Sequence, residues 1–402
     1  LNALIPGEVL QPGVELVVEL DTEGVVPVGP GSQLRIPAEG GTALDVRAVP
    51  PMTLTIVPTL IAQDPEERIF AWTNRLDASS NAMRFPRTVL PIGDLEVMVR
   101  EPYTTFSDLT TEVGWGQYLR EVNVLRMAEG AGGYYYGAVV LPSGSPYGGL
   151  GYLSVPTSVG RPNDATLAHE LGHNLSLRHA PCGNVASYDP NYPYAGGVIG
   201  VWGYDNLRGP GLATLQSPDQ VKDLMGYCSP RWISDYHFKK ALSYRLEAEP
   251  FPGPQGVTEP VLLLWGGVEK GVLMLEPAFA LEAPPVLPVE AGPYRLEGVA
   301  EDGRRLFSLD FGLMEVSQGG GHFSFAVPVD PGDVGALYAV TLRGPEGAAT
   351  MDRSAGARPA ALVRDGATGE IRAIIREGTV PPALADGSVV TSSLRLSGEG
   401  PE

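Results

Sequence analysis

Three of the five histidines in the chain lie in one segment, residues 169–179, with the sequence His-Glu-Leu-Gly-His-Asn-Leu-Ser-Leu-Arg-His. On an α-helix, His169 and His173 lie one turn apart on the same face, where two imidazoles can bind one metal ion. A continuous helix would carry His179 about 240° around the axis and about 9 Å along it from His173. We therefore expect the helix to end near Leu175–Leu177 and the chain to turn back, so that His179 becomes a third ligand.

The residue after the first histidine, Glu170, supplies a carboxylate about 100° around the same helix, within reach of a water on the metal. The alternative is a buried helix whose histidines are satisfied by hydrogen bonds in the core. Three histidines at ligand spacing, in a chain with only five, argue against that alternative. The segment predicts one catalytic zinc ion held by His169, His173 and His179, with an open position for water.

The segment resembles the extended zinc-protease signature of the metzincins, His-Glu-x-x-His-x-x-Gly-x-x-His. One position departs from it, because Ser176 stands where the family has a glycine that allows the sharp turn after the helix. Serine adopts a positive φ only at a cost on the order of 1 kcal/mol. The resemblance implies a secreted zinc-dependent endopeptidase in which a zinc-activated water attacks the peptide bond and Glu170 is the general base.

A second feature of that family follows at residues 223–228, Asp-Leu-Met-Gly-Tyr-Cys. It resembles the Met-turn beneath the metal, with Met225 as its methionine. Tyr227, two residues later, resembles the Met-x-Tyr of astacins and serralysins, in which the phenol can ligate zinc and stabilise the oxyanion. The alternative for Tyr227 is a packed aromatic residue whose hydroxyl bonds to backbone. Both interpretations of Tyr227 stay open at this point.

The only two cysteines, Cys182 and Cys228, follow His179 and Met225 by three residues each. Both are expected near the floor of the metal site, so we predict a disulfide between them, as adamalysin-like enzymes also tether this region with disulfides. Two free thiols or a thiolate zinc ligand are the alternatives, and three histidines already complete a catalytic set. Histidine spacing and cysteine placement favour adamalysin-like (reprolysin-like) enzymes, whereas Met-x-Tyr favours astacins and serralysins, so the subfamily stays unassigned.

Composition restricts the partners and the compartment. The formal net charge is −19 and the sequence pI is about 4.7, which argues against nucleic acid and anionic membranes as partners. No apolar run approaches the ~18 residues of a transmembrane segment. The chain opens without the basic and apolar regions of a signal peptide, so we expect any such peptide to have been removed. Two cysteines and an excess of arginine over lysine fit a secreted, extracellular or periplasmic, bacterial protein.

The chain divides into three parts by composition, and we predict an α+β fold. Residues 1–50, rich in Gly, Pro and Val, are expected to form an N-terminal β-rich module. Residues 51–247 are expected to form the metzincin-like zinc protease domain, a twisted mixed sheet with the active-site helix. In residues 248–402 helical periodicity gives way to short apolar runs between Pro- and Gly-rich turns, which predicts a C-terminal all-β, sandwich-like domain.

Within the central part, the hydrophobic pattern predicts individual elements. Leu167, Leu171 and Leu175 recur at helical spacing and should face the core. The expected elements are strands at 53–61, 95–99 and 134–141, helices at 66–80 and 113–130, the active-site helix from a cap at Asn163 or Asp164, and a last helix from Ser234 or Asp235 to about Glu247.

A Gly-rich stretch before the active-site helix is the expected edge strand for substrate, to which an extended protein or peptide would add by backbone hydrogen bonds. Two other functions are a glycoprotein- or mucin-directed metalloprotease with a glycan-binding β domain, and a non-catalytic adhesion or binding protein with a degenerate protease domain. The intact Glu170 argues against the latter. Calcium (Ca²⁺) is not indicated, the oligomeric state is open, and His237 and His322 are interpreted as structural or surface residues. The expected substrate strand consists of Leu150, Gly151, Tyr152, Leu153 and Ser154.

Overall fold

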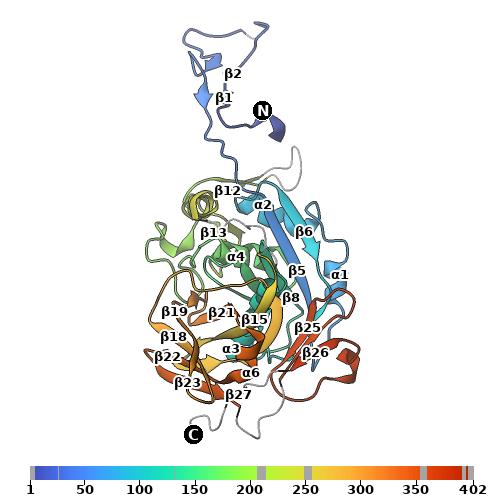
Figure 1. Ribbon diagram of the computed structural model, residues 1–402. Coiled ribbons are helices and arrows are strands. Elements are labelled where there is room, and N and C mark those ends of the chain that lie inside the picture. Colours follow the sequence, from blue (N-terminus) through green and yellow to red (C-terminus); the bar gives the residue numbers. More distant parts are fainter. Residues whose placement is uncertain are drawn as a thin grey trace.

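The computed structural model describes residues 5–25, 27–130, 132–205, 214–248, 256–353, 360–391 and 395–396. Over these ranges the fold is mixed α+β and strand-rich, which confirms the predicted fold class at that level. A narrow N-terminal arm, residues 5–50, extends away from a body that holds the other described residues (Figure 1). In the described ranges no helix has the length and apolar character needed to cross a membrane.

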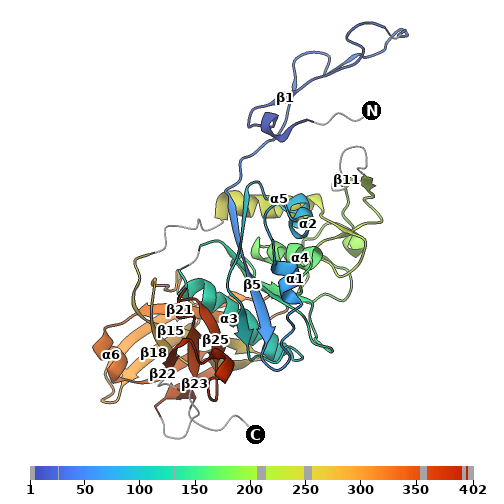
Figure 2. The ribbon, with the colours of Figure 1, turned by 90° about the vertical axis from the view of Figure 1, so that its right-hand side faces the viewer.

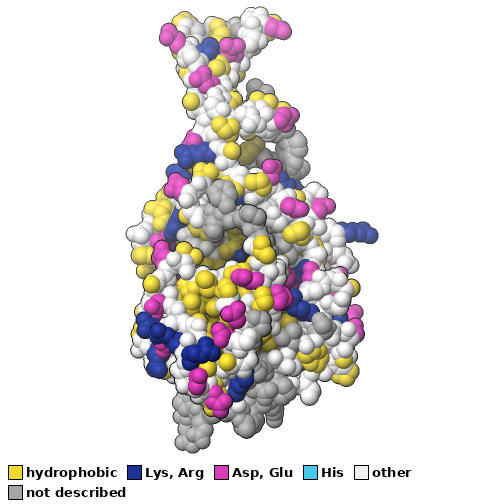
Figure 3. Space-filling model, in the orientation of Figure 1, with side chains coloured by type: hydrophobic (Ala, Val, Ile, Leu, Met, Phe, Trp, Pro, Cys, Tyr) yellow, Lys and Arg dark blue, Asp and Glu magenta, His cyan; other side chains and the backbone are white. Residues whose placement is uncertain are grey.

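The N-terminal arm consists of short strand pairs without a core. β1 (Glu15–Leu16) pairs with β4 (Thr42–Ala43), and β2 (Val18–Glu19) pairs with β3 (Arg35–Ile36), both antiparallel. Each strand is two residues long, and the described side chains of the arm are exposed or half-buried. Apolar and acidic side chains therefore share its surface (Figure 3).

The body is built on a nine-stranded sheet with the order β26-β24-β25-β7-β5-β8-β10-β9, and β6 also pairs with β5. The central strands β5, β6, β7, β8 and β10 run parallel, while β9 is antiparallel to β10 and forms one edge. These strands are β5 (Met52–Ile61), β6 (Leu95–Val99), β7 (Tyr103–Thr105), β8 (Tyr134–Val139), β9 (Gly149–Gly151), β10 (Thr157–Gly160), β24 (Ala361–Arg364), β25 (Ile371–Ile375) and β26 (Ser388–Thr391).

Successive side chains of a strand point to opposite faces of the sheet, so apolar residues lie on both faces here. Helices cover both faces. Val57 of β5 packs in the cluster that contains α3 (Glu112–Ala128). Ile56, one residue earlier, packs in the opposite cluster with α2 (Asn81–Val89) and α4 (Asp164–Asn174). The other helices are α1 (Ile69–Thr73) and α5 (Asp235–Ser243), the latter continued by a π-helical turn over Tyr244–Ala248.

The helix expected at 66–80 is wrong in extent. It is the five-residue α1, and α2 follows as a separate helix over residues that carried no prediction. The break has a local cause: Arg75 has a positive φ of 69°, and the Asp77 carboxylate accepts hydrogen bonds from the backbone and hydroxyl of Ser79. A side-chain turn of this kind competes with helical hydrogen bonding.

The C-terminal β region, residues 256–353 with 395–396, contains two five-stranded sheets that share one hydrophobic core. Leu264 and Phe323 contribute from one sheet, and Leu296 and Leu342 contribute from the other. The first sheet holds β15 (Glu259–Glu269), β16 (Val272–Leu275), β17 (Phe279–Ala283), β20 (Met314–Glu315) and β21 (Gly321–Pro328). The second holds β18 (Tyr294–Ala300), β19 (Arg305–Phe311), β22 (Leu337–Gly344), β23 (Gly347–Asp352) and β27 (Arg395–Leu396), with α6 (Pro331–Ala336) before β22.

Helix α3 lies between the central sheet and the first sheet of the C-terminal β region (Figure 2). Arg120 of α3 is fully buried and its guanidinium lies 3.0 Å from Glu276, whose other oxygen lies 2.6 Å from Arg376. His322 is buried in the same place, 2.9 Å from Arg120 and 2.8 Å from the hydroxyl of Tyr152. Buried charges are tolerated when they are paired, so this network joins the two parts of the body.

After the C-terminal β region the chain returns to the central sheet. β25 runs parallel to β7, with Ala373 opposite Thr104, and β24 and β26 extend the sheet beyond it. Composition carried no sign of this return, because short apolar runs look alike in either sheet. The edge of the central sheet opposite to β9 is therefore formed by residues near the end of the chain.

Candidate metal centre

Helix α4 begins and ends as its sequence predicts. The Asn163 side chain accepts a hydrogen bond from the backbone of Thr166 at 2.8 Å and caps the first turn. Leu167 and Leu171 face the core, and the other side of the helix, with His169 and Glu170, lines a surface cleft. The helix ends at Asn174, and Ser176 takes a positive φ of 70°. Serine therefore makes the turn for which the related signature uses glycine.

The turn brings the three histidines of the segment together. The candidate ligand atoms of His169, His173 and His179 all lie within 4.8 Å of one another, and all three residues are buried. Each ring donates its Nδ1–H to a backbone carbonyl, which leaves Nε2 as the nitrogen that carries the lone pair. The accepting carbonyls belong to Leu224 at 2.9 Å, Leu177 at 2.7 Å and Ala186 at 2.6 Å.

Burial makes this cluster suitable for a cation. It lowers the pKa of His169 to about 3 and that of His173 well below its usual value, so both rings stay neutral and keep a lone pair on Nε2. Among the described residues, His173 Nε2 and Glu170 Oε2 are buried without a hydrogen-bond partner. Burial also raises the pKa of Glu170 well above its usual range, so the carboxyl needs a nearby positive charge to ionise. Both orphaned groups fit a zinc ion.

Met225 lies directly under the helix. A Cβ atom added to Gly172 would come within 2.5 Å of the Met225 sulfur, so the glycine allows this contact. The turn is held by Asp223, whose Oδ1 lies 2.8 Å from the Met225 backbone nitrogen and whose Oδ2 lies 2.8 Å from that of Ser234. His237 is buried and its Nδ1 lies 2.8 Å from the same carboxylate. His237 is thus a structural residue, and the Asp223–His237 pair was not anticipated.

Tyr227 is half exposed and turns its hydroxyl towards the histidine cluster. The hydroxyl lies 3.3 Å from Nε2 of His179, the ring nitrogen that does not bond to backbone, and is placed to donate to it. Gln318, which comes from the C-terminal β region, donates its side-chain amide to the same oxygen. The hydroxyl therefore has side-chain partners at the site, which differs from the alternative of a packed ring bonded to backbone. No sequence pattern pointed to Gln318.

The two cysteines form a disulfide, as predicted. Cys182 and Cys228 have their Cα atoms 5.8 Å apart and close a loop with a sequence separation of 46. The Tyr227 backbone also donates to the carbonyl of Cys182 at 2.9 Å. The disulfide thus ties the chain after His179 to the chain after Met225, on the floor of the cluster.

Replacement of both Cys182 and Cys228 by serine is expected to lower the melting temperature, because a cross-link of this loop length contributes about 4 kcal/mol in the chain-entropy model. Calorimetry of the variant and of the wild type checks this. The variant should also bind zinc more weakly, since His179 and the Met225 turn lose their link. An unchanged melting temperature would show that the cross-link does not limit stability.

The expected substrate strand lies at the sheet edge but is only partly open. The outward backbone groups of Gly151 and Leu153 already pair with the C-terminal β region: Ser317 N–H donates to Gly151 O, and Leu153 N–H donates to Glu315 O, each at 2.9 Å. The side chain of Tyr152 is buried. In the strand expected to bind substrate, residues 150–154, a segment distant in sequence therefore already occupies the outward backbone groups of Gly151 and Leu153.

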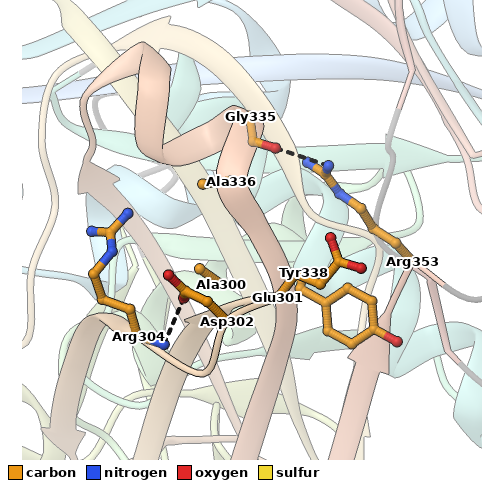
Figure 4. A pocket seen from close by; sticks show the side chains of 8 residues that line it. All are labelled: Ala300, Glu301, Asp302, Arg304, Gly335, Ala336, Tyr338 and Arg353. Atoms are coloured by element: carbon orange, nitrogen blue, oxygen red, sulfur yellow. Dashed lines mark hydrogen bonds between the residues drawn. The ribbon is translucent and has the colours of Figure 1, made fainter.

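Two surface cavities differ in the chemical groups that line them. The cleft beside the histidines has a volume of about 460 Å³ and is lined by His169, Glu170 and Tyr227 among others. A larger hollow of about 680 Å³ lies beside α6 (Figure 4), but Arg353 there already donates to Gly335 O at 2.9 Å. Arg304, on its other side, lies 3.3 Å from Asp333. The cleft combines candidate metal ligands with an unpartnered carboxyl, so we take it as the functional site.

Comparisons with known proteins cover the part of the chain that holds the histidine segment. Residues 104–224 match the family model of peptidase M66, a range that includes the whole histidine segment and stops one residue before Met225. A dictomallein-like protein of Hahella chejuensis is 38% identical over 74 residues, which is 18% of this chain. The chain spans only 12% of that relative's length. The similarity to peptidase M66 supports a metalloprotease.

Proposed function

We propose that this protein is a zinc-dependent endopeptidase of the metzincin clan. His169, His173 and His179 hold one zinc ion, and Glu170 is the general base. The observation that carries the proposal is the convergence of three buried imidazoles, each with Nε2 free of backbone, next to a buried carboxyl without a partner. The match to peptidase M66 supports the same reaction class.

Zinc, when bound, supplies a Lewis acid that polarises the peptide carbonyl and activates a water. Glu170 takes a proton from the attacking water and passes it to the leaving amine. Its position next to His169 on the helix places the carboxyl at the cleft, where Gly149 leaves room for it. Tyr227, whose hydroxyl accepts a hydrogen bond from Gln318, donates its own proton towards the oxyanion.

We further propose that the substrate is a protein or peptide and that the enzyme works outside the cytoplasm. The Cys182–Cys228 disulfide supports this compartment, since disulfides persist in oxidising environments. A formal net charge of −19 disfavours binding to nucleic acid or to anionic membranes.

Metal removal tests the proposed function. The purified protein is expected to hold one zinc per chain by elemental analysis and to cleave casein. A chelator should abolish cleavage and added zinc should restore it, while His173→Ala should neither retain zinc nor cleave. Active protein without a tightly bound transition metal would overturn the proposal. Bound zinc with no cleavage of casein or of an O-glycosylated protein would favour a non-catalytic binding protein.

A further inference from the structure

The outer edge of residues 151–153, at the end of β9, is paired by residues 315–317. Together with Gln318, these residues form what we call the closing segment. Val316 lies opposite Tyr152 in an antiparallel bridge. Hydrogen bonds on either side of this bridge join Glu315 to Leu153 and Ser317 to Gly151. The closing segment thus extends the central sheet at the position where a bound peptide would be the next strand.

Side chains hold the closing segment at both ends. At one end the Glu315 carboxylate forms a two-point ion pair with Arg178, at 2.6 and 2.5 Å. Near the other end the Ser317 hydroxyl lies 3.3 Å from the Gly151 nitrogen, and Gln318 donates to Tyr227. After Gln318, two glycines at 319 and 320 have positive φ values of 100° and 82° and turn the chain away into β21. The segment is therefore built into the cleft wall.

The closing segment ends beside the reacting groups. A Cβ atom added to Gly149 would lie 2.4 Å from Glu170 Oε1, and one added to Gly151 would lie 3.2 Å from Oε2. The bond to be hydrolysed must therefore lie level with β9 between these two glycines. Beyond Gly151, towards Leu153, the closing segment takes the outward hydrogen bonds of the strand. Tyr152 and Gly148 bond towards β10, so Gly149, like Gly151, faces outward, beyond the last hydrogen bond that the closing segment makes.

Chain direction decides which half of a substrate is excluded. The closing segment runs antiparallel to β9 and approaches the site with its C-terminal end. A peptide added to the same edge in the same direction would place the residues before its scissile bond where residues 315–317 lie. The residues after the scissile bond would lie beside Gly149 and Gly148, which line the open cleft.

We propose that the closing segment replaces the substrate on the N-terminal side of the scissile bond. The enzyme then recognises its substrates through the residues C-terminal to the scissile bond. On the N-terminal side of that bond, no more than about one substrate residue lies along the edge strand before the substrate chain turns away. The substrate class is a peptide or protein segment that is extended after the cleavage site and unconstrained before it. This inference rests on the proposed peptidase function.

Two series of shortened versions of one peptide, called the N-terminal and C-terminal ladders, test this inference. A digest of casein identifies a well-cleaved sequence, from which residues are then removed one at a time from either end. Removing residues more than one position before the scissile bond should change kcat/KM by less than about threefold. Removing residues after the bond should lower kcat/KM by about tenfold per lost backbone pair. Equal losses on both sides, or losses only on the N-terminal side, would overturn the inference.

An opened variant provides the complementary measurement. Glu315→Ala combined with Ser317→Pro removes the ion pair with Arg178 and the hydrogen bond to Gly151 O. In this variant, residues before the scissile bond should begin to raise kcat/KM by at least about fivefold. Asp310→Ala is the matched control, because it breaks an equally exposed arginine–carboxylate pair of the same region with Arg295, away from the cleft.

The outcomes separate the inference from the proposed function. If the wild type cleaves no peptide, the peptidase proposal fails. If it cleaves but its ladders are symmetric, only the closing-segment inference fails. If the opened variant loses zinc or its folded circular dichroism spectrum, the wild-type ladders alone decide. An opened, folded variant whose ladders equal those of the wild type would also overturn the inference.

Discussion

Replacement of Glu170 by glutamine is expected to lower kcat by at least about 10²–10⁴-fold, the usual effect of removing a general base. Glutamine has nearly the same shape, so the buried space beside Gly149 stays filled and the fold should be unchanged. The amide, however, cannot accept a proton from water at any accessible pH. Because the three imidazoles are untouched, zinc should remain at one per chain. Steady-state cleavage of one peptide, together with elemental analysis, measures both quantities.

The matched control for this change is Glu346→Gln, an exposed carboxylate in the C-terminal β region that bonds to Tyr294. It should leave kcat within about twofold. If Glu170→Gln retained more than a tenth of wild-type turnover, Glu170 would not be the base. If the variant lost zinc, the carboxyl would be part of metal binding, and the kinetic loss could not be assigned to proton transfer.

Replacement of Tyr227 by phenylalanine is expected to lower kcat by about 10²–10³-fold with little change in KM, as for the loss of one oxyanion donor. The hydroxyl lies 3.3 Å from Nε2 of His179 and accepts a hydrogen bond from Gln318. Its ring is half exposed, so the substitution removes little packing. A packed turn residue would instead leave kcat within about threefold and lower stability slightly.

A variant of Gln318 separates the role of the Tyr227 hydroxyl from that of its hydrogen-bond partner. If its amide orients the Tyr227 hydroxyl, Gln318→Ala should lower kcat by a smaller factor than Tyr227→Phe, and the double variant should be no slower than Tyr227→Phe alone. Independent, multiplying effects would mean that the two residues act separately. An unchanged kcat in Tyr227→Phe would remove Tyr227 from the catalytic set, whatever Gln318 does.

Local spacing predicted much of the candidate site. The i, i+4 separation of His169 and His173 defines one helix face, and six further residues to His179 require a turn, which Ser176 makes with its positive φ. These relations depend only on helix geometry and on the chain length between ligands. The pairing of Cys182 with Cys228 also followed from where each stands relative to this segment.

The tertiary structure alone decided which groups surround the cluster. Gln318 contacts Tyr227 across 91 positions of the chain, and residues 315–317 pair with residues 151–153 across a still longer separation. The buried Asp223–His237 pair supports the Met225 turn from the following helix. None of these contacts has a spacing rule, because they join elements whose relative placement depends on the packing of several sheets.

The sequence by itself therefore predicted the candidate metal-ligand set, the turn that brings it together and the α+β class, since each depends on short-range periodicity. The tertiary structure decided how much of the cleft is open to substrate. The physical reason is that the outward hydrogen bonds of an edge strand are backbone groups, which every residue except proline carries. Their pairing with Glu315 and Ser317 leaves no mark in the residue types of residues 151–153. It forms in the tertiary structure, where α3 and the buried Arg120–Glu276 pair connect the C-terminal β region to the central sheet.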